Sequence, residues 1–313
     1  MKPHVAVRMI RSLAMSAALL AAGAALSLLP AAPAIARTPA AAAADFGVGA
    51  QYDTAHVYVA PEDFERFVAS LLATFGGTTS KQGVFTVTPT PSSTMSQLVL
   101  TPAGTLSVFG FKTPVPWPFG AERTGYLVSD IDAAVEAARR AGADVLVKTF
   151  PDPIGRDVIV QWPGGVHMQL YWHTTAPSYP PLQTIPENRV YLSADRAAAF
   201  VRSFLAFSRG KVVSDDAHAP GVEIGRPGDT YRRIRIASSY GKLTVLVTDG
   251  HLPWPYGRET TGYEVGDLAA TLDKAKAAGA QVLVDAYAAD QRTEAMVQFP
   301  GGYVAEIHAA ARH

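Results

Sequence analysis

The chain has 313 residues, and its 27 lysines and arginines balance its 27 aspartates and glutamates, so the formal net charge is zero. It carries no basic patch or charge run of the kind that nucleic acid requires, so we expect no nucleic-acid partner. Cysteine is absent, which excludes disulfides, thiol nucleophiles and cysteine-based zinc sites.

The first 44 residues have the pattern of an export signal. A basic start with Lys2, Arg8 and Arg11 precedes an apolar run from Ser12 to Leu29, and small residues follow up to Ala44. Together these features predict a secretory signal peptide that is cleaved after Ala36 or Ala44. The alternative is an uncleaved membrane anchor, but the run is short for a bilayer span and rich in alanine. We therefore expect an exported protein, periplasmic or secreted, without a membrane segment after cleavage.

The first half of the remaining chain alternates short strands and helices. A strand at 55–59 precedes a helix, where Phe64, Phe67, Val68 and Leu71 recur at the helical spacing and Gly76 marks the end. Further strands reach 106–111. A fifth strand then leads into a second helix at 131–141, which Gly142 closes, and the last strand covers 166–172. This order is βαβββ, twice over.

An internal repeat is the strongest feature of the sequence. Three motifs recur at one offset of 137 residues: Pro116–Gly120 as Pro253–Gly257, Thr124–Val128 as Thr261–Val265, and Gln161–Gly165 as Gln298–Gly302. A shared offset over three separated motifs indicates a duplicated unit. The repeat predicts a leader at 1–44, a first copy at 45–173, a proline-rich stiff linker at 174–187 and a second copy at 188–313.

The motifs resemble those of the vicinal oxygen chelate superfamily, which includes glyoxalase I, extradiol dioxygenases and bleomycin-resistance proteins. They are a histidine in the first strand, a Val-x-Asp-Ile or Val-x-Asp-Leu lead into the second helix, and a Pro-Gly-Gly turn before the last strand. The resemblance implies an α+β fold in which four βαβββ modules form two glyoxalase-like half-barrel domains. It also implies a cavity that holds a divalent metal or an organic ligand.

The family's ligand positions, carried over by the resemblance, fall on unlike residues in the two copies. They are His56 and Arg189 on the first strand, Arg123 and Thr260 on the fifth, and Gln169 and Glu306 on the last, with Ser107 and Thr244 on the fourth. Neither copy keeps a complete metal triad. In members with paired domains the first strand of one domain often faces the later strands of the other. That pairing would bring His56 to Glu306 and Thr260, and would bring Arg189 to Arg123 and Gln169.

The best candidate metal ligands are therefore His56 and Glu306, with His308 as a third ligand. An imidazole and a carboxylate suit Zn, Fe, Mn or Ni, and His308 lies on the same strand face as Glu306. Glu306 or Glu264 would then carry protons in a lyase or dioxygenase reaction. The alternative for His56 and Glu306 is a satisfied core histidine and a rim carboxylate.

A second set of residues is expected to bind an organic ligand. Arg123, Arg189 and Gln169 suit the binding of a carboxylate or phosphate. The alternative is that the two arginines are ordinary surface residues. Tyr58 and Tyr191 follow the first-strand positions by two residues, and Trp117 and Trp254 lie in proline-flanked loops. These aromatic side chains could equally belong to the core or to packing between the copies. Thr260 and His251 complete the set. Three functions stay open: a metal-dependent enzyme, a metal-free protein that sequesters a small molecule, and a decayed site that serves association. We expect a monomer or a homodimer.

Overall fold

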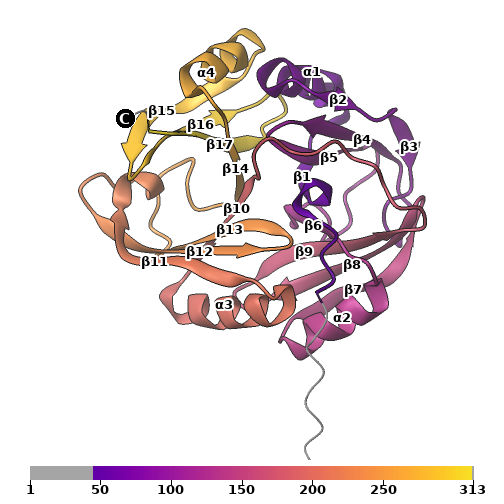
Figure 1. Ribbon diagram of the computed structural model, residues 1–313. Helices are drawn as coiled ribbons and strands as arrows, with labels where there is room; N and C mark the ends of the chain where they lie inside the picture. The colour runs from indigo at the N-terminus through magenta and orange to yellow at the C-terminus, as the bar shows by residue number, and fades with distance from the viewer. Residues whose placement is uncertain (1–44, 312–313) are drawn as a thin grey trace, which may run out of the picture. The chain divides into compact units, whose positions relative to one another are not determined.

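The computed structural model describes residues 45–311, so the predicted export signal lies outside the described residues and stays a prediction. Within this part each copy of the repeat folds into one mixed β-sheet that carries two helices (Figure 1). None of the helices within 45–311 has the length and apolar character that a membrane crossing requires.

The first sheet has the strand order β2-β4-β5-β1-β6-β9-β8-β7, and β3 pairs with β4. Its parallel pairs β1–β5 and β6–β9 meet at the antiparallel pair β1–β6, so two βαβββ modules join at the centre of the sheet. In chain order its elements are η1 (Ala50–Tyr52), β1 (Thr54–Tyr58), η2 (Pro61–Asp63), α1 (Phe64–Phe75), β2 (Thr78–Thr79), β3 (Gly83–Phe85), β4 (Thr94–Thr101), β5 (Gly104–Phe111), β6 (Thr124–Leu127), α2 (Ile131–Arg140), β7 (Asp144–Asp152), β8 (Gly155–Trp162) and β9 (Val166–His173).

The second sheet repeats this plan in the order β11-β12-β13-β10-β14-β17-β16-β15. Its elements are β10 (Glu187–Leu192), α3 (Ala194–Ser208), β11 (Lys211–Pro220), η3 (Gly221–Ile224), β12 (Thr230–Ser238), β13 (Gly241–Val247), β14 (Thr260–Glu264), α4 (Leu268–Ala277), β15 (Gln281–Ala289), β16 (Arg292–Gln298) and β17 (Val304–Ala310). The predicted α+β fold of four modules in two half-barrels is thus confirmed.

The strand registers confirm the repeat residue by residue. His56 pairs with Ser107 in the first sheet, and Arg189 pairs with Thr244 in the second. Gly125 pairs with Gln169, and Gly262 pairs with Glu306. His56 and Arg189 therefore occupy equivalent positions, as do Gln169 and Glu306.

The second helix of each copy begins at an aspartate that caps it. The Asp130 carboxylate accepts a hydrogen bond from the backbone N–H of Ala133 at 3.0 Å, and Asp267 accepts one from Ala270 at 3.0 Å. These bonds satisfy backbone donors that the first helical turn leaves free. The Val-x-Asp lead recognised in the sequence is therefore a helix cap.

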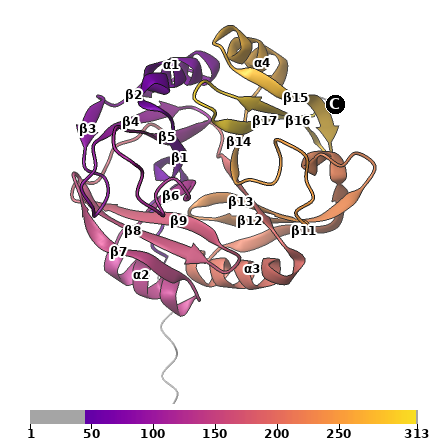
Figure 2. The same cartoon turned by 180° about the vertical axis from the view of Figure 1, so that it is seen from behind.

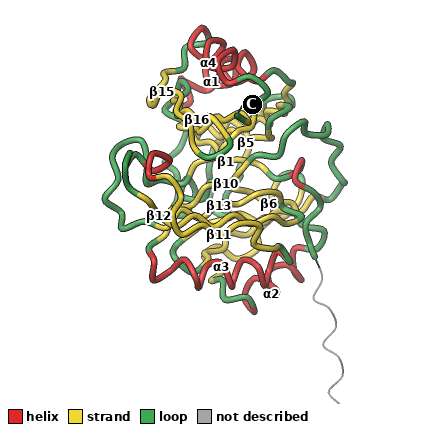
Figure 3. The backbone as a smooth tube through the Cα atoms, turned by 60° about the vertical axis from the view of Figure 1, so that its left-hand side comes forward, coloured by secondary structure: helices red, strands yellow, loops and turns green. Residues whose placement is uncertain are grey.

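The hydrophobic cores are shared between the copies. One core combines Tyr126, Trp162 and Met168 of the first copy with Phe200 and Phe204 of the second. The other combines the buried face of α1 with residues of β14, α4 and β17, so α1 lies against α4 and α2 lies against α3 (Figures 1 and 2). Seen from the side, the helices form two outer layers with the strands between them (Figure 3). Residues 45–311 accordingly lie within one compact unit.

The repeated Pro-Gly-Gly turns join the copies symmetrically. A Cβ atom on Gly164 would lie 2.6 Å from the Leu192 side chain of the second copy, and one on Gly301 would lie 2.8 Å from Val59 of the first. Both glycines also have positive φ, 99° and 82°, which side chains disfavour. The turn requires glycine because the other copy's first strand ends against it.

Candidate functional site

The structure separates the two residues that we expected to share a metal. His56 lies on β1 of the first sheet and faces that sheet's own cavity, whereas Glu306 lies on β17 of the second sheet. Glu306 instead contacts Arg189 of its own copy at 3.5 Å. The expectation of pairing across copies is wrong, because each first strand forms hydrogen bonds with the fifth strand of the same copy. Arg189 is likewise separated from Arg123 and Gln169.

His56 is buried among rings and a carboxylate, but within residues 45–311 its Nδ1 has no hydrogen-bond partner. Its side chain is 2% exposed, and its ring meets the ring of Phe109 edge to face, with centroids 5.4 Å apart. Its Nδ1 lies 3.6 Å from the buried carboxylate of Glu122, which also accepts a hydrogen bond from the Tyr58 hydroxyl. A Cβ on Gly125 would lie 2.4 Å from His56 Nε2. The glycine of the repeated Thr-Gly-Tyr motif therefore makes room for the first-strand side chain.

The first copy encloses a cavity of about 160 Å³ with aromatic walls. Eight of its lining side chains carry rings: His56, Tyr58, Phe85, Phe109, Phe119, Tyr171, His173 and Tyr179. The polar groups that reach it include Ser107, Gln169 and Asp157. Burial, together with the nearby carboxylates of Asp152 and Glu122, raises the pKa of Asp157 well above its usual value. A volume near 150 Å³ accommodates a single benzene-sized ring, so the cavity suits a small ring with few polar groups.

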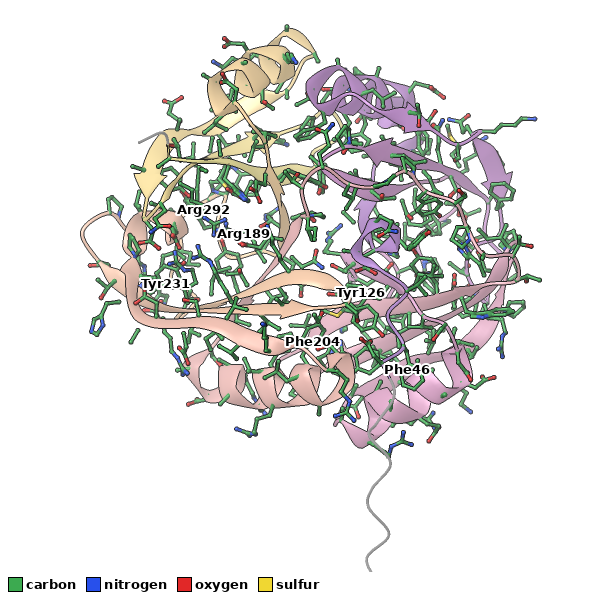
Figure 4. The ribbon with its side chains drawn as sticks, in the orientation of Figure 1. Phe46, Tyr126, Arg189, Phe204, Tyr231 and Arg292 are labelled. Carbon is green, nitrogen blue, oxygen red and sulfur yellow. The ribbon has the colours of Figure 1, made fainter. Side chains whose placement is uncertain are left out.

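The interior of the second copy is charged instead. Arg189 is 3% exposed and lies 3.5 Å from Glu187, 3.8 Å from Glu294 and 3.5 Å from Glu306. Arg292 contacts Glu187 and Glu294 as well, at 3.4 and 2.9 Å. Figure 4 shows Arg189, Arg292 and Tyr231 inside the curve of the second sheet. A cation therefore occupies the position that is equivalent to His56.

The ionisation of this network follows from its geometry. Burial alone would raise the pKa of Glu187, but Arg292, Arg189 and other cations lower it to about 2. Burial raises the pKa of Glu294 to about 7, assisted by Glu306 and opposed by Arg189. Burial disfavours the charged form of Arg189, yet its three carboxylates outweigh burial and raise its pKa. The guanidinium thus stays charged and offsets the negative charge of the carboxylates around it.

The residues at the family's ligand positions do not make a divalent metal centre in either copy. In the second copy the Arg189 guanidinium already neutralises Glu306, and a fixed cation opposes metal binding. In the first copy only His56 and Glu122 meet, whereas a zinc site uses three or four protein ligands. Across residues 45–311 no three His, Asp or Glu side chains are placed to hold a metal ion.

The remaining predicted residues are dispersed. His308 and Glu264 line a large cavity of the second copy, where His308 Nδ1 lies 2.9 Å from Glu306 and Glu264 lies 2.9 Å from Lys242. Thr260 is buried beside Arg189 in the strand register. The other predicted residues lie outside the two barrel cavities: Tyr191 packs against a small core near Leu246, Arg123 lines a cleft between the copies, His251 is exposed, and Trp117 and Trp254 are 72% and 56% exposed.

Two residues in and around the first cavity were missed in the sequence: Glu122, which lies beside His56, and Tyr179, which lines the cavity. Glu122 recurs as Glu259 at the offset of 137 residues, so the repeat contained a signal for it. Tyr179 belongs to the proline-rich linker and lines the first cavity. Its ring packs on the ring of Tyr52, with the centroids 5.3 Å apart. Burial raises the pKa of Tyr179 to about 12, so its hydroxyl is neutral and can donate a hydrogen bond. No sequence signal distinguished this tyrosine from an ordinary linker residue.

Comparison with known proteins identifies the fold. No protein-family model and no curated protein sequence matches the chain. Among solved structures, a mutant of 4-hydroxymandelate synthase from Streptomyces coelicolor is similar with a TM-score of 0.59 and 14% identity, over 86% of this chain and 95% of that chain. The Mn(II)-bound glyoxalase from Novosphingobium aromaticivorans has a TM-score of 0.53 at 12% identity, over 86% and 84%.

A third similar structure is 2,2',3-trihydroxybiphenyl 1,2-dioxygenase from Sphingomonas wittichii, with a TM-score of 0.51 and 13% identity over 86% of this chain and 91% of that chain. At these identities the likeness concerns the fold and not the chemistry. The resemblance drawn from the motifs is confirmed at that level: residues 45–311 have the fold of the vicinal oxygen chelate superfamily.

Proposed function

We propose that this protein binds a small organic molecule with one ring in the cavity of the first copy, without a catalytic metal. The observation that carries the proposal is the wall of eight rings around a volume of about 160 Å³. Burying one ring removes apolar surface from water, and each Å² contributes roughly 25 cal/mol. Ser107, Gln169 and Asp157 supply hydrogen-bonding groups that would orient a hydroxyl or carbonyl on that ring.

A metal-dependent lyase or dioxygenase is less well supported. That function needs His56 and Glu306 in one site, and they belong to different sheets. The neighbouring structures are a synthase, a glyoxalase and a dioxygenase, but their reactions belong to those proteins. A further observation that favours binding is that the Tyr58 hydroxyl donates a hydrogen bond to Glu122 Oε1, the carboxylate oxygen that lies 3.6 Å from His56 Nδ1.

Binding of phenol, measured by calorimetry, tests the proposal. We expect the native protein to bind phenol, and Leu98→Trp to abolish binding because Leu98 lines the cavity on β4 and a larger ring would fill it. Leu100→Trp is the matched control: it lies two residues further along the same strand and outside the cavity lining. Equal binding by native protein and Leu98→Trp would refute the assignment of the site.

Metal analysis provides the second arm of the test. We expect protein dialysed against Zn²⁺, Mn²⁺ or Fe²⁺ to retain no stoichiometric metal, and phenol binding to be the same before and after dialysis. One equivalent of metal that is lost in His56→Ala would establish the metal-dependent function instead.

We also propose that the protein is exported, on the strength of the basic start, apolar run and small-residue exit within 1–44. The absence of cysteine is compatible with any redox compartment, so it does not decide the question. N-terminal sequencing of exported protein should give a start after Ala36 or Ala44. An intact Met1 would contradict the proposal.

A further inference from the structure

The second copy contains a larger cavity with a different character from the first. It has a volume of about 1010 Å³, and it lies on the concave side of the second sheet around β12, β13 and the end of β17. Most of its charged groups are already paired. Arg292 contacts Glu187, Lys242 contacts Glu264, and Arg233 contacts Asp216 and Asp290.

Arg235 is the exception among the charged residues that line this cavity. It makes no ion pair with any residue in 45–311, and its Nε is buried without a hydrogen-bond partner. Burial and the neighbouring Arg292 lower its pKa, while Glu187 raises it. An unpaired guanidinium in a half-buried position is costly, and an anion that accepts its hydrogen bonds would remove that cost.

A second unsatisfied group lies directly beside Arg235. Thr244 on β13 is the register partner of Arg235 on β12, so the two side chains project from the same face of the sheet. Thr244 is 1% exposed, it lines the same cavity, and its hydroxyl oxygen is buried without a partner. Two adjacent hydrogen-bond donors on one cavity wall therefore lack an acceptor. This is unusual, because most buried polar groups in folded proteins are hydrogen-bonded.

The first copy shows that this pair is not required by the fold. The equivalent register pair there is Leu98 and Ser107, which line the aromatic cavity. The same two positions therefore carry an apolar and a small polar residue in one copy, and a guanidinium and a hydroxyl in the other. The two cavities of one chain are built for ligands of different chemistry.

We infer that the cavity of the second copy binds a small monocarboxylate, whose oxygens accept hydrogen bonds from Arg235 and the Thr244 hydroxyl. A guanidinium presents parallel N–H groups that match a carboxylate. A single negative charge suits the one unpaired cation. A dianion would meet the carboxylates of Glu187 and Glu264 in the same wall without further cations to balance it. The cavity volume leaves room for an organic body behind the carboxylate.

Calorimetric titration with hexanoate tests this site, because an aliphatic acid lacks the ring that the first cavity favours. We expect native protein to bind hexanoate, and Arg235→Leu, which installs the first copy's residue, to weaken binding at least about tenfold. Thr244→Val should weaken it several-fold, and Arg235→Lys should restore part of the loss, because lysine keeps the charge without the fork. Arg226→Gln is the matched control, since Arg226 pairs with the exposed Asp249 and neither residue lines this cavity.

The outcomes separate this inference from the proposed function. Phenol binding should be unchanged in Arg235→Leu, and hexanoate binding should be unchanged in Leu98→Trp. Arg235→Leu should also be at least as stable as native protein in urea, because it removes an unpaired buried cation. Sulfate should compete weakly. Equal hexanoate affinity in native protein, Arg235→Leu and Thr244→Val, or no binding by the native protein, would overturn the inference.

Discussion

Replacing Arg189 with methionine should destabilise the protein strongly, and more at high pH than at low pH. The side chain is 3% exposed and its guanidinium lies within 3.8 Å of Glu187, Glu294 and Glu306, whose side chains are 6%, 0% and 0% exposed. Methionine keeps the apolar stem and removes the charge. Removing one partner of a buried ion pair leaves an uncompensated charge and typically costs about 3–5 kcal/mol. Here three carboxylates lose a cation, so we expect the upper part of that range at pH 8.

The pH dependence follows from Glu294. Its pKa in the native protein is about 7, so at pH 5 it is largely protonated and needs no cation. Arg189→Met should therefore cost at least about 1 kcal/mol less at pH 5 than at pH 8, since each pKa unit corresponds to about 1.4 kcal/mol. Urea unfolding at both pH values measures the difference, with the midpoint and slope compared at each.

A surface arginine provides the control for this experiment. Arg232 pairs with Asp215 at 2.7 Å, but both side chains are more than 40% exposed, so Arg232→Met should change the unfolding free energy by less than about 1 kcal/mol. A cost below about 1 kcal/mol for Arg189→Met at pH 8, or the same cost at both pH values, would refute the view that this guanidinium balances the buried carboxylates.

Two further predictions concern acid stability and the shared core. The pKa of Glu187 falls from 4.5 to about 2 on folding, so its contribution to the free energy of unfolding is complete above pH 4.5 and is lost as the pH falls through 2. Glu187→Gln should therefore cost about 3 kcal/mol in urea unfolding at pH 7 and almost nothing near pH 2. An equal cost at both pH values would contradict this assignment. Phe204 is 1% exposed, and its ring lies 5.8 Å from that of Trp162 in the other copy, so Phe204→Ala should cost about 3–5 kcal/mol. Unfolding followed by tryptophan fluorescence and circular dichroism should still show one transition, and two separate transitions would show that the copies fold independently.

Much of the fold is readable in the sequence because the repeat and the local signals agree. The common offset predicts that equivalent residues share positions, and the registers of β1 and β10 confirm it. The aspartates before α2 and α4 are helix caps in both copies. The exchange of His56 for Arg189 at one position was visible as well, and it already indicated that the two copies differ in chemistry.

What the sequence alone determined was the module, its duplication and the residue types at each equivalent position. Only the tertiary structure decided which modules pair, because all four have the same element order. The edge of β6 in the same copy and the edge of β14 in the other copy are equivalent partners for β1. The observed β1–β6 and β10–β14 pairs keep each cavity within its own copy and so separate His56 from Glu306. The helices, by contrast, pair between the copies, and α1 packs on α4 of the other copy. The apolar face of a helix must be buried, but its pattern does not specify which surface buries it. Strand edges thus pair within a copy while helix faces pack between copies. Both kinds of contact join segments that lie far apart in the chain, so the local sequence pattern does not specify them.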